Sequence, residues 1–252
     1  MKASALEFRF RYLVHVVIYT LGFTTPWNYL LHLDGRSVIG KAIWLPAALE
    51  IERAGWLSLT GASNLLLGLG IAFALAAAGL RTWGAAYLSS AVVKDGGMHT
   101  SVHGGAVVAD GPYRHMRNPL YVGTFLHTFA LALLMPVSGA IFAVVAIGIE
   151  QWRLIGGEEA FLEGKLGATY LEYKARVPRL FPSLKARVAA SGTRPAWGMA
   201  IVGEIYMWGV AVAFASVGTK YNAFLVIQGV VIALGVSLVA RAFVPKPVEA
   251  AV

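Results

Sequence analysis

The sequence predicts an all-α integral membrane protein with about six transmembrane helices, including a tight helical hairpin formed by the third and fourth, and cytoplasmic amphipathic helices. The first observation is composition: 58% of the 252 residues are hydrophobic and 13% are charged. Soluble domains are nearer half apolar and a quarter charged. The second is the mean hydropathy of +0.66. The third is that several long segments carry almost no formal charge. A transmembrane helix needs roughly 20 consecutive, mostly apolar residues.

The first two spans are predicted at residues 12–33 and 56–80, because neither segment contains Asp, Glu, Lys or Arg. Residues 42–49 between them are apolar but too short to cross a bilayer, and they contain Pro46. We therefore expect this short segment to lie at the membrane interface.

The third and fourth spans are predicted as a hairpin within residues 118–149, a run of 32 residues without formal charge. A single helix of that length would overshoot the bilayer, since each residue adds about 1.5 Å. Pro136, followed by Val-Ser-Gly, favours a turn in the middle. We therefore predict two short spans, at residues 119–135 and 137–152. The alternative is one kinked, tilted helix.

The last two spans are predicted at residues 197–217, which only Glu204 interrupts, and at residues 221–240. Residues 156–195 before them form a long polar stretch whose first part has apolar residues at helical spacing. Gly167 divides this stretch and Val177-Pro178 ends its helical part. We expect two short amphipathic helices on the cytoplasmic surface, and the alternative is a segment that only covers the membrane surface.

The distribution of basic residues predicts the orientation. Of the 21 Lys and Arg, 17 fall in the two terminal tails, the second loop and the fourth loop. The other side of the membrane carries Arg36, Lys41, Arg53 and Lys220. Basic residues concentrate on cytoplasmic loops, so both termini should be cytoplasmic. This topology also accounts for the net charge of +8 without nucleic acid, for which no aromatic and basic binding surface is visible.

Two segments combine polar, aromatic and turn residues, and the hairpin would bring them to the same side of the membrane. Residues 110–123 read DGPYRHMRNPLYVG, and residues 157–182 read GEEAFLEGKLGATYLEYKARVPRLFP. Together they resemble the two ordered motifs of the isoprenylcysteine carboxyl methyltransferase and phospholipid N-methyltransferase superfamily. The first is Gly-Pro-Tyr-Arg followed by Arg-His/Asn-Pro-x-Tyr-x-Gly. The second is paired Glu, Leu, Gly, Tyr-x-x-Tyr and Val-Pro-Arg, and the resemblance covers about residues 107–182.

The first motif also has a physical interpretation that does not depend on the family. Asn118 is a favourable N-cap and Pro119 suits a first helical turn, so the third span should begin here. Its free N–H groups and positive dipole end would bind an anionic group at the cytoplasmic boundary. The alternative is that Arg114, His115 and Arg117 only anchor the helix at lipid headgroups.

The resemblance implies S-adenosyl-L-methionine as the cofactor. This molecule carries a sulfonium cation, a ribose diol and an adenine, so its site needs a carboxylate or aromatic face, acceptors and apolar walls. By resemblance, the cofactor-binding positions are Gly105, Ala106, Val107, Val108, Tyr113, Asn118, Pro119, Tyr121 and Glu158. His103 is a further candidate for the cofactor pocket. Asn118 stands where His is common in the family, so an amide replaces a ring.

Methyl transfer is an in-line displacement at an activated carbon, so alignment and exclusion of water can supply most of the catalysis. An amine acceptor must first lose a proton, for which Glu159 or a nearby His is the candidate base. Carboxyl, thiol and amine acceptors all stay open. The family's substrate-side Arg would fall on Leu154, so Arg153, one position away, is the candidate for that role.

Glu204 is predicted to bind substrate, because an acid inside a membrane span is costly and is functional by default. The alternatives are an ion pair with another helix and snorkelling to the interface. No metal site is predicted, because His99, His103 and His115 lack ligand spacing.

The resemblance divides the chain into residues 1–104 with two membrane helices, a methyltransferase core at 105–187, and residues 188–252 with two more helices. We expect a methyltransferase that acts at the cytoplasmic face on a lipophilic small molecule, a lipid or a lipidated acceptor from the bilayer. One alternative is a membrane reductase that resembles the sterol reductases and uses NADPH. The other is a noncatalytic transporter or scaffold, which Glu204 and the last two helices would favour.

Overall fold

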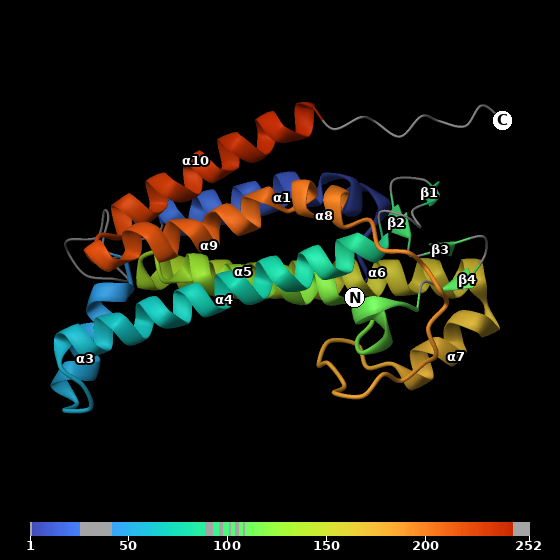
Figure 1. Ribbon diagram of the computed structural model, residues 1–252, viewed down its shortest axis with the longest axis horizontal. Helices are drawn as coiled ribbons and strands as arrows, with labels where there is room; N and C mark the ends of the chain where they lie inside the picture. The colour runs from blue at the N-terminus through green and yellow to red at the C-terminus, as the bar shows by residue number, and fades with distance from the viewer. Residues whose placement is uncertain are drawn as a thin grey trace.

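The computed structural model describes residues 2–25, 42–88, 93–95, 98–100, 102–103, 106–107 and 109–243, and most of them are helical (Figure 1). The helices are α1 (Ala5–Thr24), α3 (Trp44–Arg53), α4 (Leu59–Leu88), α5 (Pro119–Ala132), α6 (Val137–Leu166), α7 (Ala168–Arg176), α8 (Trp197–Gly203), α9 (Ile205–Val217), α10 (Ala223–Ala242) and the short 3-10 helices η1 (Gly111–Arg114) and η2 (Gly218–Lys220). The long helices run along the longest axis of the molecule, with α3 near one end and α7 near the other.

Three helices of the described chain, α4, α6 and α10, are long and apolar enough to cross a membrane. The pair α8 and α9 would add a fourth span, although it is bent by 63°. α5 is apolar but shorter, and the first predicted span continues beyond α1 into residues 26–33, outside the described residues. The count of six spans therefore stays a prediction, while the apolar helical architecture is confirmed.

The hairpin predicted within residues 118–149 is confirmed. α5 ends at Ala132, and α6 begins at Val137 with Pro136 as its N-cap, so the chain reverses where Pro136 cannot continue a helix. Two backbone N–H groups at the start of α3, those of Ile43 and Trp44, donate to carbonyls of this turn. The alternative of one kinked helix is wrong.

The predicted end of the fourth span near residue 152 is wrong, because α6 continues without interruption for 30 residues to Leu166. The helix stops at Gly167, whose φ of +53° is a left-handed conformation that favours glycine. The division at Gly167 and the end of α7 before Pro178 are confirmed. The first predicted amphipathic helix is thus the last part of a membrane helix, which makes the segment rigidly continuous with the hairpin.

The helix predicted at residues 197–217 is broken at Glu204 into α8 and α9, and that this bent pair forms one span stays a prediction. Two short antiparallel ladders were not predicted: β1 (Val93–Asp95) pairs with β2 (Met98–Thr100), and β3 (Val102–His103) pairs with β4 (Ala106–Val107). They are too short to change the helical class. In Figure 1 both ladders lie at the α7 end of the molecule.

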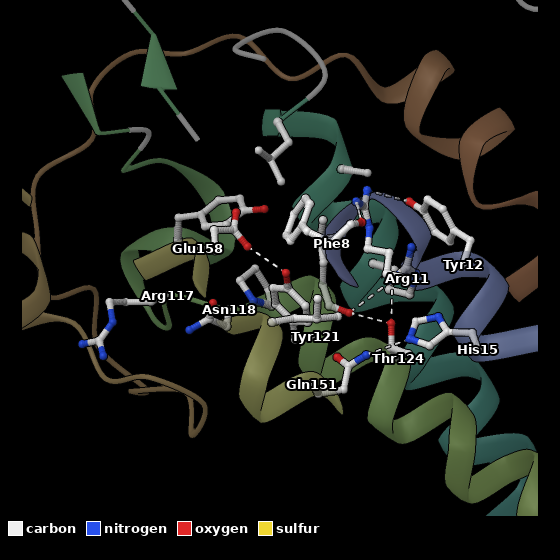
Figure 2. A pocket seen from close by; sticks show the side chains of 17 residues that line it. Phe8, Arg11, Tyr12, His15, Arg117, Asn118, Tyr121, Thr124, Gln151 and Glu158 are labelled. Atoms are coloured by element: carbon white, nitrogen blue, oxygen red, sulfur yellow. Dashed lines mark hydrogen bonds between the residues drawn. The ribbon is translucent and has the colours of Figure 1, made fainter. Parts of the chain in front are cut away.

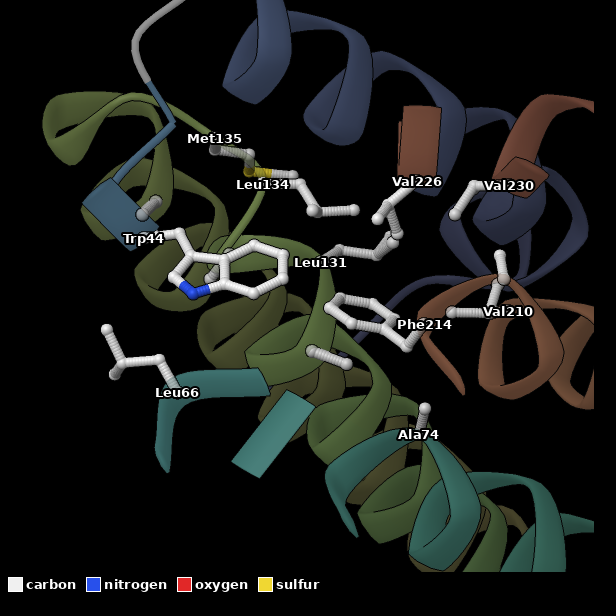
Figure 3. Close-up of a cluster of buried hydrophobic side chains, with 14 of the residues drawn as sticks. Trp44, Leu66, Ala74, Leu131, Leu134, Met135, Val210, Phe214, Val226 and Val230 are labelled. Carbon is white, nitrogen blue, oxygen red and sulfur yellow. The ribbon is translucent and has the colours of Figure 1, made fainter. Parts of the chain in front are cut away.

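A hydrophobic core lies where α3, α4, the hairpin, α9 and α10 meet (Figure 3). Phe214 and Leu131 are fully buried at its centre, and the indole of Trp44 lies beside the Phe214 ring. The indole N–H of Trp44 donates to the Ser63 carbonyl at 3.1 Å, so this buried polar atom is satisfied. This core packs around the turn of the hairpin, where α5 ends and α6 begins. The candidate site lies at the other end of the hairpin, near the start of α5 and the second half of α6.

Close approach of α1 to α6 depends on two glycines. A Cβ built on Gly139 of α6 would collide with the carbonyl oxygen of Gly22 in α1. Small residues allow membrane helices to approach closely. The amino end of α1 is held to the same helix, because the N–H of Ala3 donates to the Arg153 carbonyl at 2.9 Å.

We expect Gly139→Ala to destabilise the protein by about 1 to 3 kcal/mol, because the added methyl overpacks this contact. Gly164→Ala on the same helix is the matched control, since a Cβ there meets no atom within 4 Å, and Ala should support the helix as well as Gly or better. Unfolding of both variants in detergent would be followed by circular dichroism. Equal stabilities would contradict the close contact.

Candidate functional site

A cavity of about 260 Å³ lies at the end of the molecule opposite the hairpin turn (Figure 2). It is lined by Phe8, Arg11, Tyr12, His15, Arg81, Ala85, Leu88, Tyr113, Arg117, Asn118, Pro119, Leu120, Tyr121, Thr124, Gln151, Leu154 and Glu158. A second cavity of about 20 Å³ shares four of these residues, Tyr113, Arg117, Asn118 and Glu158. Residues of both motifs therefore line two adjacent cavities.

Most of the predicted cofactor-binding side chains that the structure describes line these cavities. Tyr113, Asn118, Pro119, Tyr121 and Glu158 line the larger one. Val107 and Glu159 line the smaller one. The backbones of His103 and Ala106 pair with each other in the β3–β4 ladder, whereas Gly105 and Val108 lie outside the described residues.

Tyr121 and Glu158 join the two motifs directly. The Tyr121 hydroxyl, near the start of α5, donates to Glu158 Oε2 on α6 at 2.8 Å, as the dashed line in Figure 2 shows. The reversal at Pro136 makes this contact possible, because it returns α6 along α5. One oxygen of the Glu158 carboxylate is thereby engaged, and the carboxylate borders both cavities.

Glu159 is the centre of a buried polar cluster. Its carboxylate lies 3.0 Å from the guanidinium of Arg117 and 2.6 Å from that of Arg179. Its side chain is only 4% exposed. The Arg117 guanidinium also donates to the carbonyls of Lys174 and Val177 at 2.7 and 2.6 Å. Glu159 thus ties the first motif to the segment after α7.

Asn118 does not act as the predicted side-chain cap. α5 does begin at Pro119, but the Asn118 side chain makes no capping hydrogen bond. Its amide instead donates to the Arg179 carbonyl at 3.1 Å and to Glu159 Oε1 at 3.4 Å. Tertiary hydrogen bonds to the buried carboxylate replace the local one, so Asn118 belongs to the cluster around Glu159.

Tyr113 is the buried aromatic residue between the cavities. Its side chain is 3% exposed, and its hydroxyl has no hydrogen-bond partner within the described residues. Burial raises the pKa of this phenol well above its usual value, so the hydroxyl stays protonated. α7 holds the residue from outside, because the Tyr173 hydroxyl donates to the Tyr113 carbonyl at 2.8 Å. The Tyr113 hydroxyl is therefore free to bond a ligand, and the Gln151 side-chain oxygen on the wall of the larger cavity likewise has no partner within the described residues.

Asp110 anchors the segment that follows α7 to the first motif. Its carboxylate accepts hydrogen bonds from the backbone N–H groups of Ser191 and Thr193 at 2.9 and 2.8 Å. Burial alone would raise the pKa of Asp110, but these bonds and the Ser191 hydroxyl lower it below its usual value. The carboxylate therefore stays charged at neutral pH and holds the chain over the site.

Arg153 and Glu204 line neither cavity. Arg153 forms an ion pair with Glu7 of α1 at 2.7 Å. Glu204 receives two hydrogen bonds from Arg81, at 2.7 and 2.8 Å. Arg81 itself lines the larger cavity and also donates to Thr124 at 2.7 Å. The ion-pair alternative for Glu204 is thus realised, although its proposed substrate contact stays untested.

One wall of the larger cavity was not predicted from the sequence. Arg81 follows the predicted span at residues 56–80 and was expected in the loop after it, but it lies within α4. Its position as the single charged residue of that helix could have indicated a functional role. Phe8, Arg11, Tyr12 and His15 of α1 were also missed. The spacing of Tyr12, His15 and Tyr19 along one face of α1, in its part that carries no Asp, Glu, Lys or Arg, could have indicated them. Within the described residues, no group of three or more His, Asp or Glu could hold a metal ion.

Comparison with known proteins gives a family match over the part of the chain that contains most of α4 and all of α5 and α6. Residues 65–169 match the sequence model of the phospholipid methyltransferase family. The chain is 28% identical over 171 residues to Protein-S-isoprenylcysteine O-methyltransferase of Homo sapiens and, equally, to that of Mus musculus. The matched part is 63% of this chain and 55% of each relative, so the chain spans about half the length of these curated relatives. No solved structure matches.

Proposed function

We propose that this chain is a member of the superfamily of integral membrane methyltransferases to which its matches point. In this proposal it transfers a methyl group from S-adenosyl-L-methionine to a lipophilic acceptor at the cytoplasmic face. The observation that carries this proposal is the convergence of Tyr113, Tyr121 and Glu158 on one cavity. These residues come from the two motifs that suggested the cofactor.

The residues around the cavity fit the cofactor chemically. The unpartnered hydroxyl of the buried Tyr113 can bond a polar group of a ligand, and an orphaned polar atom of this kind otherwise costs stability. The Glu158 carboxylate can face a cation or accept from a diol. The volume of about 260 Å³ is close to the lower end of the roughly 300 to 1,000 Å³ of small-molecule sites.

When bound, the cofactor supplies a methyl group that its positively charged sulfur activates for displacement. The chain's own residues position and enclose the reaction. Glu158 and Tyr121 hold the polar side of the cavity, and Leu88, Leu120 and Leu154 supply apolar walls that exclude water. The Glu159 cluster fixes the segment after α7 against the first motif. Alignment of the reactants is then the main catalytic contribution.

The lipophilic acceptor and the orientation follow from the position of the cavity. Residues of α1, α4, α5 and α6 line it, and we propose that the acceptor enters between these apolar helices from the bilayer. The end with α7 carries most of the basic loops, and we place that end and both termini in the cytoplasm.

Calorimetry of the detergent-solubilised chain tests the cofactor. We expect S-adenosylmethionine and S-adenosylhomocysteine to bind with saturable heats, and NADPH to give none. Binding of NADPH alone would favour the reductase alternative instead. If no ligand bound, the noncatalytic alternative would be favoured, and the proposed function would be abandoned.

We expect Glu158→Gln to weaken cofactor binding by about ten- to a hundredfold, because a hydrogen bond to a charged group contributes about 1.5 to 3 kcal/mol. The same calorimetric titrations measure the effect. A larger loss for S-adenosylmethionine than for S-adenosylhomocysteine would assign Glu158 to the sulfonium, and equal losses would assign it to the diol. Unchanged affinity for both would contradict a cofactor contact. Glu163→Gln is the control, since Glu163 pairs with Lys174 away from the cavity.

A further inference from the structure

The larger cavity has two chemically different ends. Glu158, Arg117 and Asn118 lie together at one end, and His15, Gln151 and Thr124 lie at the other, with Tyr121 between them (Figure 2). The first end carries the motif residues assigned above to the cofactor. The second end is therefore available for the acceptor. His15 lies on α1, outside the residues that match the family.

His15 is held through only one of its ring nitrogens. Its Nε2 lies 2.9 Å from Glu150 Oε2, and the Gln151 amide nitrogen lies 3.2 Å from the same atom. A carboxylate beside Nε2 favours the tautomer that carries its proton there. The Gln151 amide can then only accept at this atom, so its oxygen, which has no other partner within the described residues, faces Nε2 in place of its nitrogen. The lone pair is then on Nδ1, which makes no hydrogen bond within the described residues. This arrangement resembles a histidine general base oriented by a carboxylate.

Glu150 is suited to support a charge on that ring. The His15 and Glu150 side chains are 16% and 13% exposed. The contact between Glu150 Oε2 and His15 Nε2 is a close ion pair rather than a hydrogen bond of good geometry, and no other described residue donates to either carboxylate oxygen. An imidazolium formed on His15 would lie directly beside the opposite charge.

The other candidate bases are either engaged or lie away from the acceptor end of the cavity. Glu159 pairs with both Arg117 and Arg179. One oxygen of Glu158 accepts the Tyr121 hydroxyl, and this carboxylate lies at the cofactor end, opposite His15 (Figure 2). His127, the nearest histidine on α5, contacts the Tyr206 hydroxyl and lines neither cavity. Among the described acid–base groups of the larger cavity, His15 is the one with an unoccupied nitrogen lone pair.

We propose that His15, oriented by Glu150, is the general base for an acceptor whose attacking atom carries a proton, with a lipophilic amine as the favoured class. This inference rests on the proposed methyl transfer. Nδ1 of His15 first takes a proton from the acceptor's ammonium group and later gives it to solvent, which frees the electron pair on nitrogen. That pair forms the N–C bond while the S–C bond to the methyl group breaks and sulfur keeps its electron pair. A carboxylate acceptor would need no such residue.

The test uses the full chain in detergent with oleylamine and oleate as probes, and follows transfer of the tritiated methyl group from S-adenosylmethionine. We expect the wild type to label oleylamine in preference to oleate. His15→Gln should lower kcat for oleylamine by about a hundredfold or more, with KM changed less than about threefold. Its affinity for S-adenosylhomocysteine, measured separately by calorimetry, should match that of the wild type.

Two further variants separate catalysis from packing. Glu150→Gln keeps the imidazole and removes the charge that orients it, so we expect a smaller loss, on the order of tenfold. His127→Gln removes another buried histidine outside the cavity and should keep kcat within about threefold of the wild type.

Labelling of oleate alone, or of neither probe, would overturn the assignment. So would full activity of His15→Gln, or a loss in that variant that came with weakened binding of S-adenosylhomocysteine. If the wild type failed to bind S-adenosylhomocysteine at all, the proposed function itself would fail, which is a different result.

Discussion

Glu159→Gln is expected to lower the free energy of unfolding by about 3 to 5 kcal/mol, which is the usual cost of removing one partner from a buried ion pair. The variant leaves the Arg117 guanidinium, whose side chain is only 10% exposed, without a counter charge. Arg179 loses its closest carboxylate contact as well. Glutamine can keep one hydrogen bond but cannot neutralise either cation.

The same change should weaken cofactor binding, because the cluster around Glu159 holds the segment after α7 next to Tyr113 and Asn118. Denaturation in mixed micelles measures the stability, and calorimetry measures the affinity. The proposed catalytic role of Glu159 predicts a different pattern, in which kcat falls while stability and cofactor affinity stay unchanged. The two roles are therefore distinguishable in one set of experiments.

Glu163→Gln, four residues further along α6, is the matched control for stability. Glu163 pairs with Lys174, and both side chains are about one-third exposed. Exposed pairs contribute about 0 to 1 kcal/mol. If Glu159→Gln and Glu163→Gln lowered the free energy of unfolding equally, burial of the Glu159 cluster would not strengthen its ion pairs, and our expectation would be wrong.

The second large effect is expected at the ion pair between Arg81 and Glu204. Their side chains are 16% and 9% exposed, and the pair joins α4 to the break between α8 and α9. Glu204→Gln should cost about 3 to 5 kcal/mol, because it leaves a buried guanidinium uncompensated. Arg81→Met should cost a similar amount, because it strands the carboxylate.

The double variant Arg81→Met with Glu204→Leu should recover most of that loss, since well-packed apolar residues often replace a buried ion pair without net cost. Thermal unfolding of the four proteins forms a double-mutant cycle. Simple addition of the two single losses would contradict a direct pair. If the double variant folds and binds cofactor but does not methylate, a substrate role for these residues is supported.

Several features of the fold could be predicted from local sequence alone. Pro136 identified the reversal of the hairpin, because proline cannot continue a helix. Gly167 identified the boundary between α6 and α7, because its conformation favours glycine. The two motifs predicted the residues around the cofactor end of the cavity, since they contain the required polar and aromatic groups.

Two predictions failed for different physical reasons, and in the first a distant partner displaced a local one. Asn118 has the right residue type and position for a cap, but the buried carboxylate of Glu159, 41 positions away, takes its amide. The polar composition after residue 156 suggested a separate amphipathic helix, yet α6 continues without a break to Leu166.

The sequence by itself determined a membrane protein built of apolar helices, the place of the hairpin turn and the residues of one side of the site. Hydrophobic periodicity and turn residues report on the nearest few positions, and these features depend on nothing further. Only the tertiary structure decided that α1 forms the opposite wall, that Arg81 meets Glu204 across 123 positions, and that His15 lies beside Glu150. Those contacts depend on which helices pack together, and side-chain shape and burial across the whole bundle set that choice.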